Sequence, residues 1–125
     1  MKQILVIDDE ADIRIVTQVS LQITKQWLVL TAGSGEEGIA IATEKQPDAI
    51  LLDVVMPDVD GLMTLSALKR TPATQGIPVI MLTATGGIVT ELEYAELGAQ
   101  AIVTKPFDPA ILGDQIATAL HWDQD

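Results

Sequence analysis

The most constraining feature of this sequence is a short apolar segment that runs directly into an acidic residue. Residues 49–52 are apolar without alternation, and Asp53 follows them. A short continuous apolar run between turn signals is typical of a strand buried on both faces, as in a parallel sheet. Open parallel sheets place their ligand crevice at the carboxyl ends of the strands. The sequence therefore predicts a buried strand with the Asp53 carboxylate at the mouth of a crevice, where a cation or hydrogen-bond donors must compensate its charge.

Similar segments recur along the chain and alternate with helical patterns. Strand patterns cover residues 4–7, 27–31, 49–53, 77–83 and 101–104, and helical patterns cover about 12–24, 35–46, 61–71, 91–97 and 109–120. Strict strand–helix alternation favours parallel strands with helices on both faces, and right-handed crossovers favour a doubly wound topology. We therefore expect an α/β fold, with a doubly wound five-stranded parallel sheet and five helices, as one domain over residues 1–125.

Several residues predict where individual helices begin and which face they bury. Ser34, with Glu37 three residues later, forms a capping box, and Asp60 and Thr90 are candidate caps. Asp108 and Pro109 predict a helix start at Pro109. The apolar residues of the first helix recur at helical spacing and predict an amphipathic helix; they are Ile13, Val16, Val19, Leu21 and Ile23.

Composition excludes several classes of protein. Seven basic and 18 acidic residues give a net charge of −11, which argues against direct binding of nucleic acid or anionic lipid. The chain has no cysteine, so thiolate chemistry and disulfides are excluded. No apolar stretch approaches the roughly 20 residues that cross a bilayer. No signal peptide is recognised, and we expect a cytoplasmic protein without membrane contact.

Polar residues gather where the expected strands end. Asp8 and Asp9 follow the first strand, Asp53 ends the third, Thr83 ends the fourth and Lys105 follows the fifth. Carboxylates packed together repel unless they share a divalent cation, and a site built from oxygen ligands favours Mg²⁺. A hydroxyl and an ammonium beside them would bind phosphoryl oxygens, so Asp53 is a candidate nucleophile that forms an acyl phosphate.

These residues form an ordered pattern: Asp8-Asp9, then Asp53 with Met56-Pro57 and Asp60-Gly61, then Thr83-Ala84, then Lys105-Pro106-Phe107. In this order and spacing the sequence resembles, over its whole length, the receiver domain of two-component response regulators, of the single-domain chemotaxis type. The resemblance implies a flavodoxin-like fold and a phosphorylation-activated signalling switch.

The resemblance also implies a role for each residue of the pattern. Asp53 would be the phosphoacceptor and Asp9 a direct Mg²⁺ ligand, while Asp8 would act mostly through a metal-bound water. The Val55 backbone carbonyl would be a further ligand. Thr83 would move toward the phosphoryl group, Lys105 would pair with Asp53 and then with its phosphate, and the Lys105–Pro106 bond would be cis.

One position departs from the family. Three residues before Lys105 the family usually has Tyr or Phe, whose ring changes rotamer when the threonine moves, and this chain has Ile102. The phosphorylation chemistry does not need that ring, so the departure concerns how the switch is transmitted.

The implied partners are a sensor histidine kinase or histidine phosphotransfer protein, and a downstream protein target or a fused effector. The implied activity is self-catalysed phosphotransfer and autodephosphorylation, without turnover of an external metabolite. An aspartate-nucleophile phosphatase would instead place its nucleophile after the first strand in an Asp-x-Asp pattern. A flavin-binding module would need a Ser/Thr/Gly-rich loop there. We assign Asp60 only a capping role, leave the direct role of Glu10 open, and expect His121 to be an exposed terminal residue.

Overall fold

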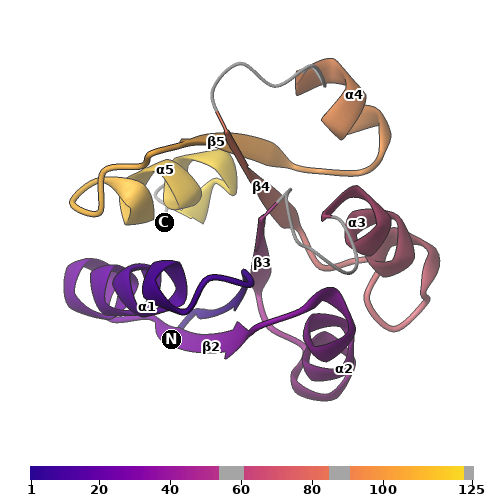
Figure 1. Ribbon diagram of the computed structural model, residues 1–125, viewed down its shortest axis with the longest axis horizontal. Coiled ribbons are helices and arrows are strands. Elements are labelled where there is room, and N and C mark those ends of the chain that lie inside the picture. The colour runs from indigo at the N-terminus through magenta and orange to yellow at the C-terminus, as the bar shows by residue number, and fades with distance from the viewer. Residues whose placement is uncertain (54–60, 85–90, 123–125) are drawn as a thin grey trace.

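The fold is known from a computed structural model that describes residues 1–53, 61–84 and 91–122. Strands and helices alternate through the described residues (Figure 1). The strands are β1 (Gln3–Ile7), β2 (Leu28–Ala32), β3 (Ala49–Asp53), β4 (Val79–Ala84) and β5 (Ala101–Lys105). The helices are α1 (Ala11–Lys25), α2 (Gly35–Lys45), α3 (Gly61–Arg70), α4 (Glu91–Glu96) and α5 (Leu112–Ala119). The described helices include none that is both long and apolar enough to span a membrane.

The five strands form one parallel sheet in the order β2-β1-β3-β4-β5. Helices α1 and α5 cover one face, and α2, α3 and α4 cover the other (Figure 1). The expected doubly wound α/β fold is therefore confirmed. The chain reverses its direction of winding between β1 and β3, and open α/β sheets bind their ligands at such a switch point.

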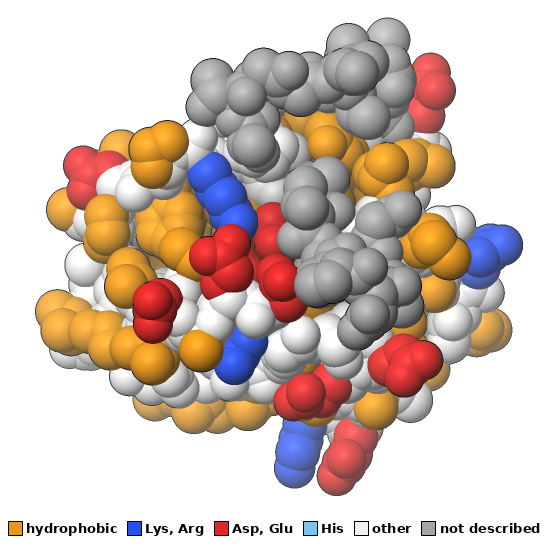
Figure 2. Space-filling view, viewed as in Figure 1, with side chains coloured by type: hydrophobic (Ala, Val, Ile, Leu, Met, Phe, Trp, Pro, Cys, Tyr) orange, Lys and Arg blue, Asp and Glu red, His pale blue; other side chains and the backbone are white. Residues whose placement is uncertain are grey.

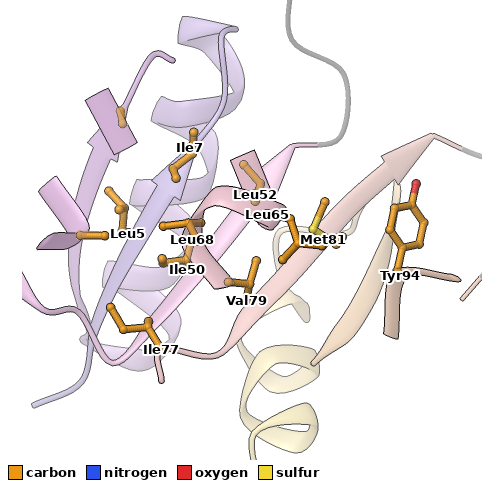
Figure 3. Close-up of a cluster of buried hydrophobic side chains, with 12 residues drawn as sticks. Leu5, Ile7, Ile50, Leu52, Leu65, Leu68, Ile77, Val79, Met81 and Tyr94 are labelled. Carbon is orange, nitrogen blue, oxygen red and sulfur yellow. The ribbon is translucent and has the colours of Figure 1, made fainter. Parts of the chain in front are cut away.

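Each central strand contributes alternate side chains to two separate cores. On the side of α2–α4, Leu5, Ile50 and Met81 belong to one buried cluster (Figure 3). On the side of α1 and α5, the neighbouring residues Ile4, Leu51 and Ile80 belong to the other. This alternation explains why the strands are continuously apolar, since both faces are covered. It also fixes the side of the sheet on which each residue beyond a strand end lies.

The helix starts were predicted with mixed success. The Ser34 hydroxyl accepts the Glu37 N–H at 3.2 Å, as expected, while the Glu37 carboxylate accepts the N–H of Gly33 at 3.3 Å. The start of the last helix at Pro109 was wrong, because α5 begins at Leu112. The Asp108 carboxylate accepts the Ala110 N–H at 2.9 Å and holds residues 109–111 in turns before the helix. The proposed caps Asp60 and Thr90 lie outside the described residues.

Helix α1 is amphipathic in an unusual way. Its buried residues are Thr17, Ser20 and Leu21. Apolar residues line its outer side, with exposed fractions of 43 to 73%: Ile15, Val16, Val19 and Ile23. The apolar spacing located the helix correctly, but it does not mark the buried face. Contacts with α5 explain this, because two small residues face the seam between the helices. Ser20 donates a hydrogen bond to the carbonyl of Pro109, and a Cβ on Gly113 would lie only 2.6 Å from Lys25 Cγ.

Candidate functional site

Three of the predicted site residues converge at the carboxyl edge of the sheet. Asp8 follows β1, Asp53 ends β3 and Lys105 ends β5. Strand alternation directs all three toward the side of α1 and α5, because Ile7 and Leu52 point to the opposite core. The ammonium of Lys105 lies 2.9 Å from Asp53 Oδ1 and 3.5 Å from Asp8 Oδ2. One cation therefore bridges two carboxylates from different strands.

The two carboxylates of this arrangement are buried, so their charges are costly unless they are compensated. Asp8 is completely buried and Asp53 is 3% exposed. Burial raises the pKa of Asp8, and the charge of Asp53 raises it further, although the N–H of Glu10 and the Lys105 charge act in the other direction. Burial alone would lower the pKa of Lys105, but its hydrogen bond to Asp53 and the charges of both carboxylates raise it above the usual value. Lys105 is therefore held as a cation at neutral pH.

The acidic residues after β1 form a group with the dimensions of a cation site. One carboxylate oxygen each from Asp8, Asp9 and Glu10 lies within 4.8 Å of the others. Asp8 Oδ2 is buried and accepts no hydrogen bond from the described residues, and the Lys105 ammonium lies 3.5 Å from it. An unsatisfied buried carboxylate oxygen beside two more open carboxylates fits a hard cation with oxygen ligands. Figure 2 shows acidic side chains gathered beside a basic one near the middle of this face.

The turn that carries these carboxylates is fixed by two hydrogen bonds. The Glu10 N–H donates to Asp8 Oδ1 at 2.9 Å, and the guanidinium of Arg14 donates from Nη1 to the Asp8 carbonyl at 2.7 Å. The first bond orients the Asp8 side chain and the second holds its main chain. Sequence reasoning missed Arg14, although its place one helical turn after Glu10 lets a long side chain reach back toward the turn.

Two other predicted site residues, Thr83 and Val55, are not seen beside Asp53 in the described part of the chain. Thr83 lies in β4 with partial exposure and is paired in register with Thr104. Strand alternation directs it to the side opposite Asp53, and within the described residues no hydrogen bond joins it to Asp53 or Lys105. Its movement toward a phosphoryl group stays a prediction. Val55, the predicted backbone ligand, lies outside the described residues. The peptide bond between Lys105 and Pro106 is cis, as expected.

An apolar groove opens directly beside Lys105. One wall comes from α1, with Ile13 and Val16, and the other from the segment after β5, with Pro106, Phe107 and Pro109. Glu10 and Lys105 close the end that adjoins the carboxylates. Sequence reasoning missed this groove too, because its two walls come from segments far apart in the sequence that meet only in the folded chain.

Comparison with known proteins identifies the family. A model of the response regulator receiver domain matches residues 4–117. The chain belongs to this family. Structurally it is similar to the chemotaxis protein CheY4 of Vibrio cholerae, with a TM-score of 0.87 and 29% identity over 95% of this chain and 98% of that one. It is also similar to a response regulator receiver domain from Clostridium thermocellum, with a TM-score of 0.85 and 32% identity over 99% of this chain and 98% of that one.

Curated relatives of this receiver domain include transcriptional regulators. It is 40% identical over 108 residues to the DNA-binding dual master transcriptional regulator RpaA of Synechocystis, covering 86% of this chain and 44% of that protein. It is 37% identical over 120 residues to the phosphate regulon regulator PhoB of Pseudomonas aeruginosa, covering 96% and 52%. The chain thus spans about half the length of these relatives. It is a receiver domain of the two-component response regulators, a family of phosphorylation-dependent signalling proteins.

Proposed function

We propose that this receiver domain accepts a phosphoryl group from a partner histidine onto Asp53, with Mg²⁺, and that the phosphorylated form changes its affinity for a protein partner. The observation that supports this most directly is the contact of Lys105 with both Asp53 and Asp8 at the switch point of the sheet. In that geometry the proposed carboxylate nucleophile lies beside a fixed cation, and the acidic group proposed to hold a metal ion adjoins both.

The transfer follows from the chemistry of Asp53. A carboxylate oxygen of Asp53 attacks the phosphorus atom of a phosphohistidine, and an O–P bond forms while the P–N bond breaks. The electron pair of the broken bond returns to the imidazole nitrogen. Lys105 is 2.9 Å from Asp53 Oδ1 and would remain beside the new phosphate, where an ammonium binds phosphoryl oxygens as a point charge. Thr83 would donate a further hydrogen bond to the phosphate once it moves.

Mg²⁺ is the cofactor that this site fits, with Asp8, Asp9 and Asp53 and the Val55 carbonyl as the proposed ligands. The buried Asp8 Oδ2, which accepts no hydrogen bond from the described residues, and the nearby Asp9 carboxylate support this choice. When bound, Mg²⁺ would neutralise negative charge that develops on the transferring phosphoryl group. Glu10, whose role the sequence left open, also belongs to the acidic group.

We further propose that the domain is a switch and not an enzyme that turns over a metabolite. Lys105 pairs directly with the proposed nucleophile, and hydrolysis of the acyl phosphate by water would return the domain to its initial state. A phosphatase on an external substrate would place its nucleophile after β1. There this chain has the adjacent pair Asp8-Asp9 in place of the Asp-x-Asp pattern that such a phosphatase would need.

The apolar groove supports a protein as the phosphoryl donor. A donor histidine must approach Asp53 through the surface around Lys105, and the groove is continuous with that surface. The exposed apolar residues Ile15, Val19 and Ile23 extend this apolar surface along α1. A helix of a histidine kinase or phosphotransfer protein could cover this strip with its apolar face. The net charge of −11 supports the prediction that these 125 residues do not themselves bind nucleic acid. A cytoplasmic location also stays a prediction.

Phosphate incorporation from acetyl phosphate tests the proposed site. Wild-type protein should form a hydroxylamine-labile phosphate only when Mg²⁺ is present. Asp53→Asn should form none, and Asp9→Ala should require more Mg²⁺ and react more slowly. Asp114→Asn is a matched control, because this exposed carboxylate pairs with Lys25 away from the site. Labelling of Asp53→Asn at the wild-type rate would show that Asp53 is not the phosphoacceptor.

The docking surface is tested by comparing two donors. Acetyl phosphate needs no protein surface, whereas a purified, phosphorylated histidine phosphotransfer domain does. Val16→Glu places a charge in the apolar groove, and we expect the ratio of the protein-donor rate to the acetyl phosphate rate to fall at least about tenfold. An unchanged ratio would exclude the groove as the docking surface.

A further inference from the structure

Arg14 connects α1 to the acidic turn after β1 through the main chain. Its side chain donates from Nη1 to the carbonyl oxygen of Asp8 at 2.7 Å, and its own N–H donates to the carbonyl of Glu10 at 3.1 Å. Within the described residues, Arg14 makes no ion pair with a carboxylate, although acidic side chains surround the turn. The guanidinium thus holds the backbone of the turn and leaves the carboxylate oxygens of Asp8 and Asp9 available.

A second turn, which follows β2, lies close to the guanidinium. Gly33 follows β2, and a Cβ at this position would lie 3.3 Å from Arg14 Nη1 and 3.7 Å from Cζ. The guanidinium therefore lies beside Gly33, where a larger side chain would press on it. Arg14 thus lies beside the turns after β1 and after β2, and its hydrogen bond to the Asp8 carbonyl joins it to the first of them.

The position of the Asp8 carbonyl determines where the neighbouring carboxylates lie. The Asp8 side chain is fixed at Oδ1 by the Glu10 N–H, which belongs to the same turn, and Oδ2 lies toward Lys105. A rotation of the turn would move the Asp8 and Asp9 carboxylates together. Residues that orient metal ligands in this way contribute strongly to metal affinity, because they reduce the reorganisation that binding requires.

We propose that Arg14 is a positioning residue for the cation-binding carboxylates: its hydrogen bond to the Asp8 carbonyl sets the turn in the conformation that receives a divalent cation. This inference rests on the Mg²⁺ site of the proposed function. The opposing effect is the charge of Arg14, which repels a cation. If Arg14 positions the carboxylates, replacing it should weaken Mg²⁺ binding. If its charge dominates, removing that charge should strengthen Mg²⁺ binding.

Calorimetric titration of the 125-residue chain with Mg²⁺ alone distinguishes the two effects. Arg14→Lys keeps the charge but loses the planar fork, and Arg14→Met loses both the charge and the hydrogen bond. Positioning predicts weaker Mg²⁺ binding by roughly tenfold for Arg14→Lys, and weaker binding for Arg14→Met as well. Gly33→Ala, which presses on the guanidinium from the other turn, should weaken binding in the same direction. The matched control is Arg70→Met, because Arg70 donates to the carbonyl of Ser66 in α3, away from the site.

Amide exchange without metal provides a readout that does not depend on cation binding. The Glu10 N–H is protected by its bond to Asp8 Oδ1, so Arg14→Lys and Arg14→Met should exchange this proton faster. Exchange in the buried strand β3 should remain as in wild type, since the fold is intact.

The outcomes separate this inference from the proposed function. Wild-type Mg²⁺ affinity in Arg14→Lys, or tighter binding in Arg14→Met, would overturn the positioning role in favour of a charge effect. Unchanged Glu10 exchange in both variants would overturn it too. Failure of the wild-type protein to bind Mg²⁺ would refute the proposed metal site, and the Glu10 exchange would still decide whether Arg14 holds the turn.

Discussion

At the scale of single residues, Asp8 is the group whose environment conflicts most with a charged state. It is completely buried, it lies near the carboxylates of Asp53 and Asp9, and its Oδ2 accepts no hydrogen bond from the described residues. Lys105 compensates only part of this charge, at 3.5 Å. Such an arrangement reduces stability but is suited to binding a cation, which explains why it persists at a functional site.

Replacement of Asp8 should therefore stabilise the metal-free protein. We expect Asp8→Asn to raise the free energy of unfolding by about 1 kcal/mol at pH 7 in chelator, since it removes a buried charge and its repulsion by Asp53. The raised pKa of Asp8 means that the folded state binds the proton more tightly than the unfolded state. Wild-type stability should therefore gain from protonation of Asp8 as the pH falls, and the advantage of the variant should shrink at acid pH.

Urea unfolding between pH 4 and pH 8 measures this difference, with Asp114→Asn as the control. The same variant should lose the stabilisation that Mg²⁺ gives the wild-type protein. A variant less stable than wild type at pH 7 without metal would show that the Lys105 contact outweighs the cost of burial.

At the scale of elements, packing decides which parts of the fold the sequence predicts. The strands were located correctly to within two residues, because continuous apolar runs are required where both faces are covered. The buried side of α1 was not predictable from its own apolar residues. Thr17 and Ser20 are buried against neighbouring elements, while Val19 and Ile23 stay exposed. The start of α5 was missed because a local Asp108 turn replaced the expected helix cap.

In our account, phosphorylation changes the conformation of the region of β4, α4 and β5. The residue at position 102 determines which part of this region changes most. Ile102 packs beside the cluster that contains Tyr94 and Met81, and it has neither the ring of the Tyr or Phe usual in the family nor a polar tip. Its β-branched side chain has restricted rotamers. We therefore expect phosphorylation to act mainly through residues 84–90, most of which lie outside the described residues, and through α4. Movement at Ile102 should be small.

Amide exchange with and without a beryllofluoride mimic of the phosphate measures which residues respond to phosphorylation. Residues 84–90 and α4 should show the larger changes in protection, and β5 around Ile102 the smaller. Strong changes confined to β5, with residues 84–90 unaffected, would contradict the expectation.

At the scale of the whole molecule, topology explains why so much of the site was predictable. Asp8, Asp53 and Lys105 are far apart in sequence, but parallel strands bring their carboxyl ends to one edge. Strand order and alternation then suffice to bring them into contact. The role of Arg14 and the groove beside Lys105 depend instead on how α1 packs against its neighbours. That packing could not be predicted from the spacing of residues in the sequence.

The central claim is that Asp53 itself carries the phosphoryl group. The most direct measurement is to treat the wild-type protein with acetyl phosphate and Mg²⁺, reduce the product with borohydride and map the peptides by mass spectrometry. Reduction of an aspartyl phosphate converts the residue to homoserine. Our account predicts homoserine at position 53 and nowhere else, with none formed when Mg²⁺ is chelated. Homoserine at position 8 or 9 with Asp53 unmodified would contradict it.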